Sequence, residues 1–245
     1  VLGAKCVGIY SYTNSIVQYF ILFGCIGLNL YGQREIAYVQ HDLKKRSQVF
    51  WELLVLRLCT VCVSLVLFYI TCVCNSQYKS IFFIMILDII AAMFDISWFF
   101  QGIEDFKKIV IRNSIIKIIG VILIFSCVKS TSDLKIYVLC HSGTLLLGNL
   151  SMWFYMPKFV SKISLKELRI FAHLKNTVIL FIPQIATSVY TILDKTMIGL
   201  LTGVEEEVAY YEQSQKIVKL VMMTVTSLGT VMLPRVANLY NKKEF

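Results

Sequence analysis

The sequence predicts an all-α polytopic membrane protein, and three observations support that fold class. Hydrophobic residues make up 57% of the 245-residue chain and charged residues only 16%, whereas soluble domains are typically about 45–50% apolar and about 25% charged. Seven apolar runs each approach the length of about 20 residues that crosses a bilayer as a helix. The runs are continuously apolar, without the alternation of a barrel strand, so helices are favoured over a barrel.

The seven runs divide the chain into predicted helices joined by short connections. They are Tyr12–Tyr31, Phe50–Val73, Ser80–Phe100, Asn113–Val128, Leu134–Tyr155, Asn176–Leu201 and Gln213–Leu233. The fourth run is short and needs residues 109–111 to reach across a membrane. The chain begins without an initiator Met and stops at "NKKEF", just beyond the last run. We therefore expect a fragment, with helices missing at both ends.

The first run carries polar residues on one side. Asn14 and Gln18 are four residues apart, and Gly24, Gly27 and Asn29 follow them. Residues three or four apart share a helix face, so the two amides face the same way. That face either lines a cavity or packs against another helix through small residues and hydrogen bonds, and the sequence leaves both interpretations open.

Basic residues are distributed unevenly between the two sides of the predicted helices. When the connections are assigned alternately, fifteen of the 24 Lys and Arg residues fall on one side and four on the other, with five inside the runs. Cytoplasmic loops carry an excess of Lys and Arg. We therefore predict that the basic loops are cytoplasmic and that the N-terminal segment and the acidic loop "VEEEVAYYE" lie outside. The net charge of +9 thus reflects multi-pass topology in an inner or plasma membrane and not nucleic-acid binding.

The cysteines and histidines do not predict a metal site or a cofactor. Most of the eight cysteines lie in or beside apolar runs, where Cys acts as a small hydrophobe. The pair in "CTVC" imitates a zinc or redox motif but lies within a run and has no second pair outside it. The three histidines, His41, His141 and His173, form no cluster along the sequence.

Charged residues inside the runs are the main functional signal. They are Arg57, Asp88, Asp95, Lys117, Asp194, Lys195, Lys216 and Lys219. Each costs about 2.5–3.5 kcal/mol at the centre of a membrane helix, so a cavity or pathway is the default hypothesis and structural ion pairs are the alternative.

Depth along each run predicts which of these charges can meet. Arg57 and Asp95 lie at similar depths from the basic side, roughly 9–11 Å at 1.5 Å per residue, so they can pair. On the other side, Asp194 lies at a depth that allows a pair with Lys216 or Lys219.

The remaining charges and Pro183 suggest a chamber that moves an anion. Asp88 lies two turns from Asp95 and closer to the middle of the membrane, whereas Lys117 is shallow enough to reach the interface. Five positive charges against three negative charges suit an anionic cargo such as a phosphate. Pro183 can break or kink its helix, which is either a hinge for alternating access or a static bend.

Seven segments together resemble the Wzx-type oligosaccharide flippases of the MATE-like exporter superfamily. They are "LGAKCVGIYSYTNSIVQYF", "YGQREIA", "DISWFFQGIEDFKKIVIRN", "YMPKFV", "FIPQIATSVYTILDKTMIG", "YYEQSQKIVKL" and "VMLPRVANLY". The resemblance covers nearly the whole chain in order, and it implies a two-lobed helical bundle of twelve to fourteen helices, of which about seven are present. Residues 1–156 are then the rest of the N-terminal lobe, 157–175 a cytoplasmic linker and 176–245 the start of the C-terminal lobe.

The resemblance also implies a cargo and roles for the charges. Such proteins carry undecaprenyl-diphosphate-linked repeat units of O-antigen or capsular polysaccharide from the inner to the outer leaflet, and they are not enzymes. The cavity cations Arg57, Lys117, Lys195, Lys216 and Lys219 would meet this lipid-linked oligosaccharide. Asp88, Asp95 and Asp194 would serve proton or sodium coupling. Membrane lipid and polysaccharide-assembly proteins are the further partners implied.

Two other functions remain open at this point. A multidrug or metabolite antiporter of the same superfamily would prefer an acidic cavity for cationic drugs, whereas these charges are mainly basic. A membrane-bound polysaccharide polymerase or ligase would need a large external loop with catalytic residues, and the connections here are short.

Overall fold

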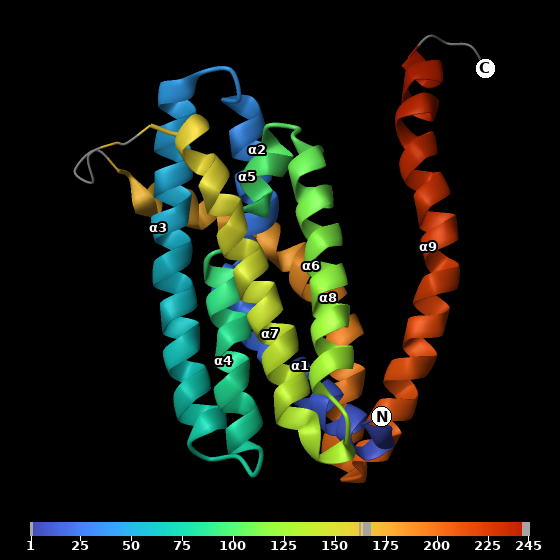
Figure 1. Cartoon of the computed structure of the whole chain (residues 1–245). Coiled ribbons are helices and arrows are strands. Elements are labelled where there is room, and N and C mark those ends of the chain that lie inside the picture. Colours follow the sequence, from blue (N-terminus) through green and yellow to red (C-terminus); the bar gives the residue numbers. More distant parts are fainter. Residues whose placement is uncertain (1, 162, 164–167, 242–245) are drawn as a thin grey trace.

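The computed structural model describes residues 2–161, 163 and 168–241, with the side chains of 189–191 and 224–241 left aside. Every long element in this part of the chain is helical (Figure 1). The α-helices are α1 (Gly3–Cys25), α2 (Leu28–Tyr38), α3 (Leu43–Phe68), α4 (Lys79–Met93), α5 (Ser97–Gly102), α6 (Phe106–Cys127), α7 (Leu134–Ser151), α8 (Leu174–Thr202) and α9 (Glu205–Asn241). The shorter turns are η1 (Tyr69–Val73), η2 (Thr131–Asp133), η3 (Met152–Lys158) and η5 (Ile170–His173).

The chain is an all-α, multi-pass membrane protein, as predicted. Five stretches of the described chain are long and apolar enough to cross a membrane: Gly3–Tyr38, Leu43–Val73, Lys79–Gly102, Phe106–Cys127 and Ile170–Ser188. The fifth and seventh predicted runs form α7 and α9, which are helical but are not among these five. Many apolar side chains face outward, Phe125 with 72% of its surface exposed among them, which suits contact with lipid tails.

Two of the predicted runs are broken helices. The first run bends between α1 and α2, where Ile26 and Gly27 have φ of 41° and 70°. This left-handed backbone costs little at glycine, and a Cβ on Gly27 would lie 3.1 Å from the backbone of Phe181 in α8. The third run breaks between Met93 and Ser97, where α4 ends and α5 begins. The apolar composition of both runs conceals these breaks.

The prediction of an acidic loop before the last run is wrong. Residues Glu205 to Asn241 form a single helix, so all of "VEEEVAYYE" after its first residue belongs to α9, and the turn after α8 contains only Gly203 and Val204. Gly203 has a φ of 64°, a conformation that favours glycine. The three glutamates in the first turn of α9 stabilise it, because their negative charges lie at the positive end of the helix dipole.

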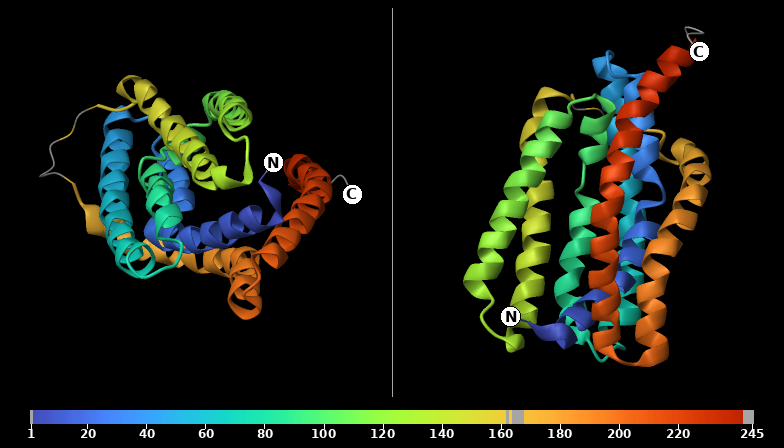
Figure 2. Two further views of the ribbon diagram at one scale, coloured as in Figure 1. Left: turned by 60° about the horizontal axis from the view of Figure 1, so that its bottom comes forward. Right: turned by 90° about the vertical axis from the view of Figure 1, so that its right-hand side faces the viewer.

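Helix α1 lies at the centre of the bundle. It packs against α3 and α4 on one side and α8 and α9 on the other, while α4 packs against α7 (Figure 2). Helix α6 packs mainly on α7, and only 6% of the residues in its most apolar stretch are buried. One core cluster surrounds Phe50 and Trp98, and a second surrounds Phe68 and Met85.

The basic connections lie at one end of the bundle. The turns before α3 and α6 and the end of η3 are at the top of Figure 1, whereas the α3–α4, α6–α7 and α8–α9 connections and the N-terminus are at the bottom. This alternation agrees with the predicted path of the chain. The predicted linker is bound to α3: Arg46 donates to the carbonyl of Phe159 (Nη2 to O, 2.8 Å), and Trp51 donates to that of Ser161 (3.0 Å).

Candidate functional site

Asp95 lies in the break between α4 and α5, one residue before Ile96, the N-cap residue of the second helix. Its Oδ1 accepts hydrogen bonds from the backbone nitrogen of Ser97 (3.0 Å) and from the Ser97 hydroxyl (2.5 Å). An aspartate side chain that accepts from a nitrogen two residues later replaces the backbone partner that a broken helix lacks. The carboxylate therefore stabilises the start of α5.

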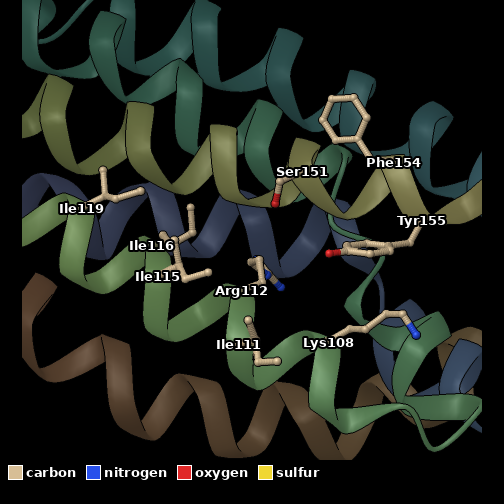
Figure 3. A pocket seen from close by; sticks show the side chains of 9 residues that line it. All are labelled: Lys108, Ile111, Arg112, Ile115, Ile116, Ile119, Ser151, Phe154 and Tyr155. Carbon is tan, nitrogen blue, oxygen red and sulfur yellow. The ribbon is translucent and has the colours of Figure 1, made fainter.

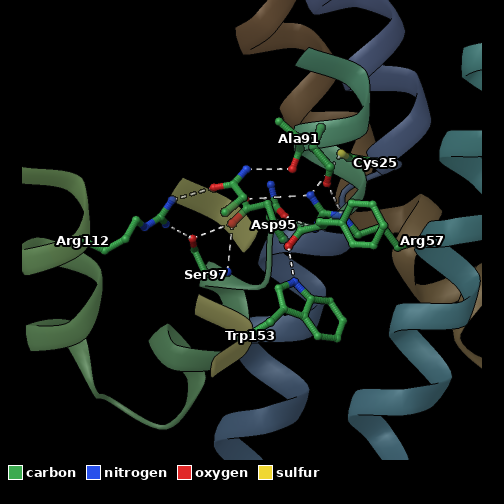
Figure 4. A network of polar contacts seen from close by, with 11 residues as sticks. Cys25, Arg57, Ala91, Asp95, Ser97, Arg112 and Trp153 are labelled. Carbon is green, nitrogen blue, oxygen red and sulfur yellow. Dashed lines mark hydrogen bonds and ion pairs between the residues drawn. The ribbon is translucent and has the colours of Figure 1, made fainter. Parts of the chain in front are cut away.

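The break leaves backbone carbonyls of the α4 end without helical partners, and side chains from other helices bind them. The three contacts are Asn149 Nδ2 to Ala91 O (2.7 Å), Arg57 Nε to Ala92 O (2.8 Å) and Trp153 Nε1 to Phe94 O (2.9 Å). Irregular backbone at membrane depth is tolerated only where protein or water satisfies it. Side chains of α3, α7 and η3 satisfy it here (Figure 4).

The predicted ion pair between Arg57 and Asp95 is present. Arg57 Nη2 lies 3.9 Å from Asp95 Oδ2, and the Arg57 side chain is 2% exposed. Its other nitrogens are also engaged: Nη1 donates to Asn29 Oδ1 at 2.7 Å, in addition to the bond from Nε to Ala92. In this conformation Arg57 is enclosed by protein, and its predicted contact with cargo stays a prediction.

The network continues to Arg112, which directly precedes the fourth predicted run. Arg112 lies in α6, where Nη2 donates to the Ser97 hydroxyl and Nη1 to Asn149 Oδ1, both at 2.6 Å. A chain of contacts therefore runs from Arg57 through Asp95 and Ser97 to Arg112 and Asn149, joining α3, α5, α6 and α7 (Figure 4). The only local sign that Arg112 belongs to this network is that a basic residue stands six positions after the start of α6.

Asp88 is more deeply buried than Asp95 and less fully bonded. Its side chain accepts from the Ser142 hydroxyl of α7 through Oδ2 at 3.0 Å, and the residue is 3% exposed. Its Oδ1 is buried without a hydrogen-bond partner in the described part of the chain. Such an oxygen can take a proton or a cation.

The polar residues of α8 and α9 pair differently from the prediction. Asp194 accepts from the hydroxyl of Tyr211, and Glu212 pairs with Lys195 and with Lys216, the latter at 3.4 Å. Lys219 donates to Gln215 at 3.2 Å. The predicted pairs of Asp194 with Lys216 or Lys219 are therefore wrong. They fail because Glu212, assigned to an external loop, lies inside α9 and supplies the carboxylate.

Helix α1 contacts α8 through a serine that lies beside the predicted polar face, not through the two amides. Ser15, between the two predicted amides, lies 2.9 Å from Thr196 through their hydroxyl oxygens. Asn14 Oδ1 accepts from Gln18 Nε2 at 3.4 Å, so these amides bond to one another on one face of α1. Helix α8 continues through Pro183, the predicted hinge.

Lys117 lies in a groove between α6 and α7 of about 430 Å³. Arg112, Asn113, His141 and Thr144 provide the other polar groups, and no carboxylate is among its described lining residues. His141 Nδ1 lies 3.3 Å from the hydroxyl of Tyr10, so this side of the α6–α7 pair faces α1. Lys117 is exposed there and forms no ion pair with the described carboxylates. The prediction that it is shallow is wrong, because α6 begins at Phe106 and not at Asn113, which places Lys117 halfway along the helix.

A second groove, of about 400 Å³, lies between α6 and η3 (Figure 3). Lys108 lines it, and a separation of nine residues places Lys108 and Lys117 on opposite sides of α6. Lys108 pairs with Asp105, and its ammonium lies 4.8 Å from the centre of the Phe159 ring. Isoleucines and aromatic rings form most of the wall. This groove is suited to lipid chains, since Lys108 is neutralised by Asp105 and Arg112 donates to Ser97 and Asn149.

A buried carboxylate that the sequence analysis did not select fixes the start of α8. Glu52 of α3 is 4% exposed and accepts from Arg169 N (2.8 Å) and Gln48 Nε2 (3.0 Å). His173 Nε2 lies 2.7 Å from its other oxygen, and His173 Nδ1 lies 2.8 Å from the hydroxyl of Tyr31 in α2. The cluster therefore binds η5 to both α2 and α3. Among the described residues no His, Cys, Asp and Glu group of three or more could hold a metal ion.

Comparison with known proteins places these features in a family. Residues 1–240 match the family described as "Polysaccharide biosynthesis protein". The chain is 28% identical over 220 residues to the "Putative O-antigen transporter" of Shigella dysenteriae, covering 87% of this chain and 54% of that protein. It is 21% identical over 207 residues to the protein of the same name from Escherichia coli (strain K12), covering 82% of this chain and 50% of that protein. No solved structure matches it.

The chain thus spans about half the length of the curated relatives that it matches. The family match extends over nearly all of the sequence and includes the broken α4–α5 segment, the α6–α7 groove and the α8–α9 charges. It confirms the resemblance to Wzx-type flippases at the level of family. The chain belongs to the polysaccharide biosynthesis protein family.

Proposed function

We propose that this chain is part of a transporter that moves undecaprenyl-diphosphate-linked oligosaccharide repeat units from the cytoplasmic to the outer leaflet by alternating access. The names of the two relatives support a cargo related to O-antigen. The observation that carries the proposal is the α6–α7 groove with Lys117 halfway along α6.

An exposed lysine at mid-helix favours an anionic cargo. A charge at that depth costs about 2.5–3.5 kcal/mol unless water or a counter-ion compensates it. Lys117 has Arg112 beside it and no carboxylate among the described lining residues, so the groove attracts negative charge. A diphosphate supplies that charge, and Asn113 and Thr144 can bond to its oxygens or to sugar hydroxyls.

The other charges divide between binding and coupling. Lys195 and Lys216 share the carboxylate of Glu212, while Asp194 accepts from Tyr211, so with Lys219 this group of α8 and α9 has one more positive than negative charge. The group forms a second place where a phosphate can bind on the path outward. Asp88 is our candidate for proton or sodium coupling, because one of its buried oxygens has no described partner. Arg57 and Asp95 serve mainly to stabilise the backbone between α4 and α5.

Alternating access requires one half of the protein to move against the other. In our proposal α8 and α9 belong to the moving half, Pro183 lets α8 bend, and the basic connections face the cytoplasm. Pro183 lacks the N–H that a helix interior uses, which lowers the cost of bending at that turn.

The test is a flipping assay with the full-length protein in proteoliposomes, using a fluorescent undecaprenyl-diphosphate-linked saccharide. Lys117→Gln should slow flipping roughly 10- to 100-fold, because a charge-assisted hydrogen bond to phosphate contributes about 1.5–3 kcal/mol. Lys117→Arg keeps the charge and should retain most activity. Lys107→Gln removes an exposed lysine of the same helix near the basic end and serves as the control. Equal rates for Lys117→Gln and Lys107→Gln would refute the role of the groove.

A further inference from the structure

A small pocket lies where the α8–α9 turn meets α1 and the start of α4, at the end of the bundle opposite the basic loops (Figure 1). Its volume is about 200 Å³. The pocket, called the corner pocket below, is lined by Tyr12, Gln77, Tyr78, Gly199, Leu200, Gly203, Glu205 and Val208. Pockets for drug-sized ligands occupy about 300–1,000 Å³, so the corner pocket suits a single small ring.

Close packing on glycine holds the walls of this pocket in place. A Cβ on Gly199 would lie 2.3 Å from the ring of Tyr12, so only glycine lets α8 lie against that ring. A Cβ on Gly8 would lie 1.7 Å from the carbonyl oxygen of Glu205, so α1 touches the first turn of α9. The pocket is therefore preformed between segments far apart in the sequence, which lowers the entropic cost of binding.

The polar groups of the pocket are oriented by one hydrogen bond. The Tyr78 hydroxyl donates to Glu205 Oε1 at 2.8 Å. Burial, followed by the adjacent Glu205 carboxylate, raises the pKa of Tyr78 to about 12, so the hydroxyl remains protonated at neutral pH. Hydrogen bonds from its own backbone nitrogen and from Tyr78 lower the pKa of Glu205, with Lys5 adding to the effect. The pocket thus presents an ionised acceptor beside a neutral phenol.

Two aromatic rings complete the pocket. Tyr12 and Tyr78 have ring centroids 6.1 Å apart at an angle of 66°. A sugar ring presents C–H groups on its faces and hydroxyls at its edge, so it can contact aromatic rings while it donates to a carboxylate. Gln77 adds an amide that both donates and accepts.

We propose that the corner pocket binds a single neutral sugar ring of the transported saccharide. The choice of ligand rests on the proposed function, whereas the pocket itself does not. A phosphate would be repelled by Glu205, and a lipid chain would leave the carboxylate, the amide and the phenol hydroxyls without polar partners. A small organic cation is the competing ligand, because two tyrosine rings beside a carboxylate can also bind one.

The test is ligand-observed saturation-transfer NMR on the purified full-length protein in nanodiscs. The probes are free hexoses and N-acetylhexosamines at millimolar concentration, with choline as the cation probe. At least one sugar should receive saturation from the wild-type protein. Tyr78→Ala should weaken that binding about tenfold or more, as expected when a central aromatic contact is removed. Glu205→Gln should weaken it by a smaller factor.

Two controls separate loss of binding from loss of fold. Tyr38→Ala removes the last residue of α2, a tyrosine that is 74% exposed and does not line the corner pocket, and should bind like the wild type. Tyr78→Phe keeps the ring and removes the hydroxyl, so it should elute like the wild type in size-exclusion chromatography but bind sugar less tightly. Binding of choline but of no sugar would overturn the proposal, as would equal sugar binding by wild type and Tyr78→Ala.

The same variants distinguish this inference from the proposed function. Sugar binding that depends on Tyr78, in a protein that does not flip the lipid-linked saccharide, would support the pocket and refute flipping. Flipping by a protein whose corner pocket binds no sugar would support the function and refute the pocket.

Discussion

Replacing Arg57 by methionine should destabilise the protein far more than replacing Lys117, although both are cations inside predicted membrane helices. Methionine is unbranched and replaces the aliphatic stem of arginine, but it provides no charge and no donor. Arg57→Met therefore removes the bonds to Ala92 and Asn29 and the 3.9 Å ion pair to Asp95. The Arg57 side chain is buried, whereas Ala92, Asn29 and Asp95 are partly exposed, so water replaces only some of the lost partners.

The size of the effect follows from those contacts. Each buried group left without a partner costs about 1–3 kcal/mol. The Ala92 carbonyl retains a weak hydrogen bond from Asp95 N at 3.4 Å, so the cost of losing its bond from Arg57 lies at the lower end of that range. Removing one member of a buried ion pair costs about 3–5 kcal/mol, and because the Asp95 side chain is 25% exposed we expect the free energy of unfolding to change by the lower value, about 3 kcal/mol. A shift in the apparent melting temperature on the order of 10 °C corresponds to it.

The assay is thermal unfolding in detergent, followed by fluorescence-detected size-exclusion chromatography, with a parallel measure of folded protein in the membrane. Lys117→Met is the matched control, because Lys117 is exposed and forms no described ion pair. It should stay within about 0.5 kcal/mol of the wild type. If Arg57→Met proved as stable as Lys117→Met, the inference that Arg57 secures the α4–α5 break would be wrong.

Two further substitutions test other contacts. Glu52→Gln removes the charge of the carboxylate that accepts from His173 and the Arg169 backbone. The free energy of opening measured by amide hydrogen exchange at residues 169–176 should fall by about 1–3 kcal/mol. Unchanged protection there would contradict the role of the cluster. Gly8→Ala should lower the stability of the protein by about 1–3 kcal/mol in the same unfolding assay, because the new Cβ would lie 1.7 Å from a backbone oxygen of α9. Gly143→Ala is its control: nothing lies within 4 Å of a Cβ there, so it should be neutral or stabilise the helix by about 0.5–1 kcal/mol. Equal effects of the two alanines would show that α1 and α9 do not touch.

The pairing of Arg57 with Asp95 could be predicted because depth in a membrane helix is read from residue counts. Arg57 lies on a run that begins at the basic end and Asp95 on a run that ends there, and their similar depth from that end brought them within reach. The same arithmetic failed for Asp194, because it omitted Glu212. The segment containing Glu212 is polar and was taken for a loop, although its Glu, Gln and Lys residues are good helix formers.

The break at Asp95 could not be predicted from the apolar run around it. No Gly or Pro marks positions 94–96, and the stretch is as hydrophobic as a continuous helix. The faint local signal is an aspartate two residues before a serine, a pattern that caps helices. What makes the break stable is distant in the sequence: Asn149 and Arg57 bind the freed carbonyls.

The sequence by itself determined that the chain is a set of membrane-crossing helices with its basic connections at one end. A backbone in lipid must satisfy its own hydrogen bonds, so apolar length alone dictates helices, whatever their neighbours are. The tertiary structure decided which charges are enclosed, which pair with one another and which remain exposed in a groove. Sequence gives the height of a residue along its helix, but the rotation of each helix and the identity of its neighbours come only from packing. For that reason Arg57 is enclosed within the bundle and Lys117 lies in the open groove.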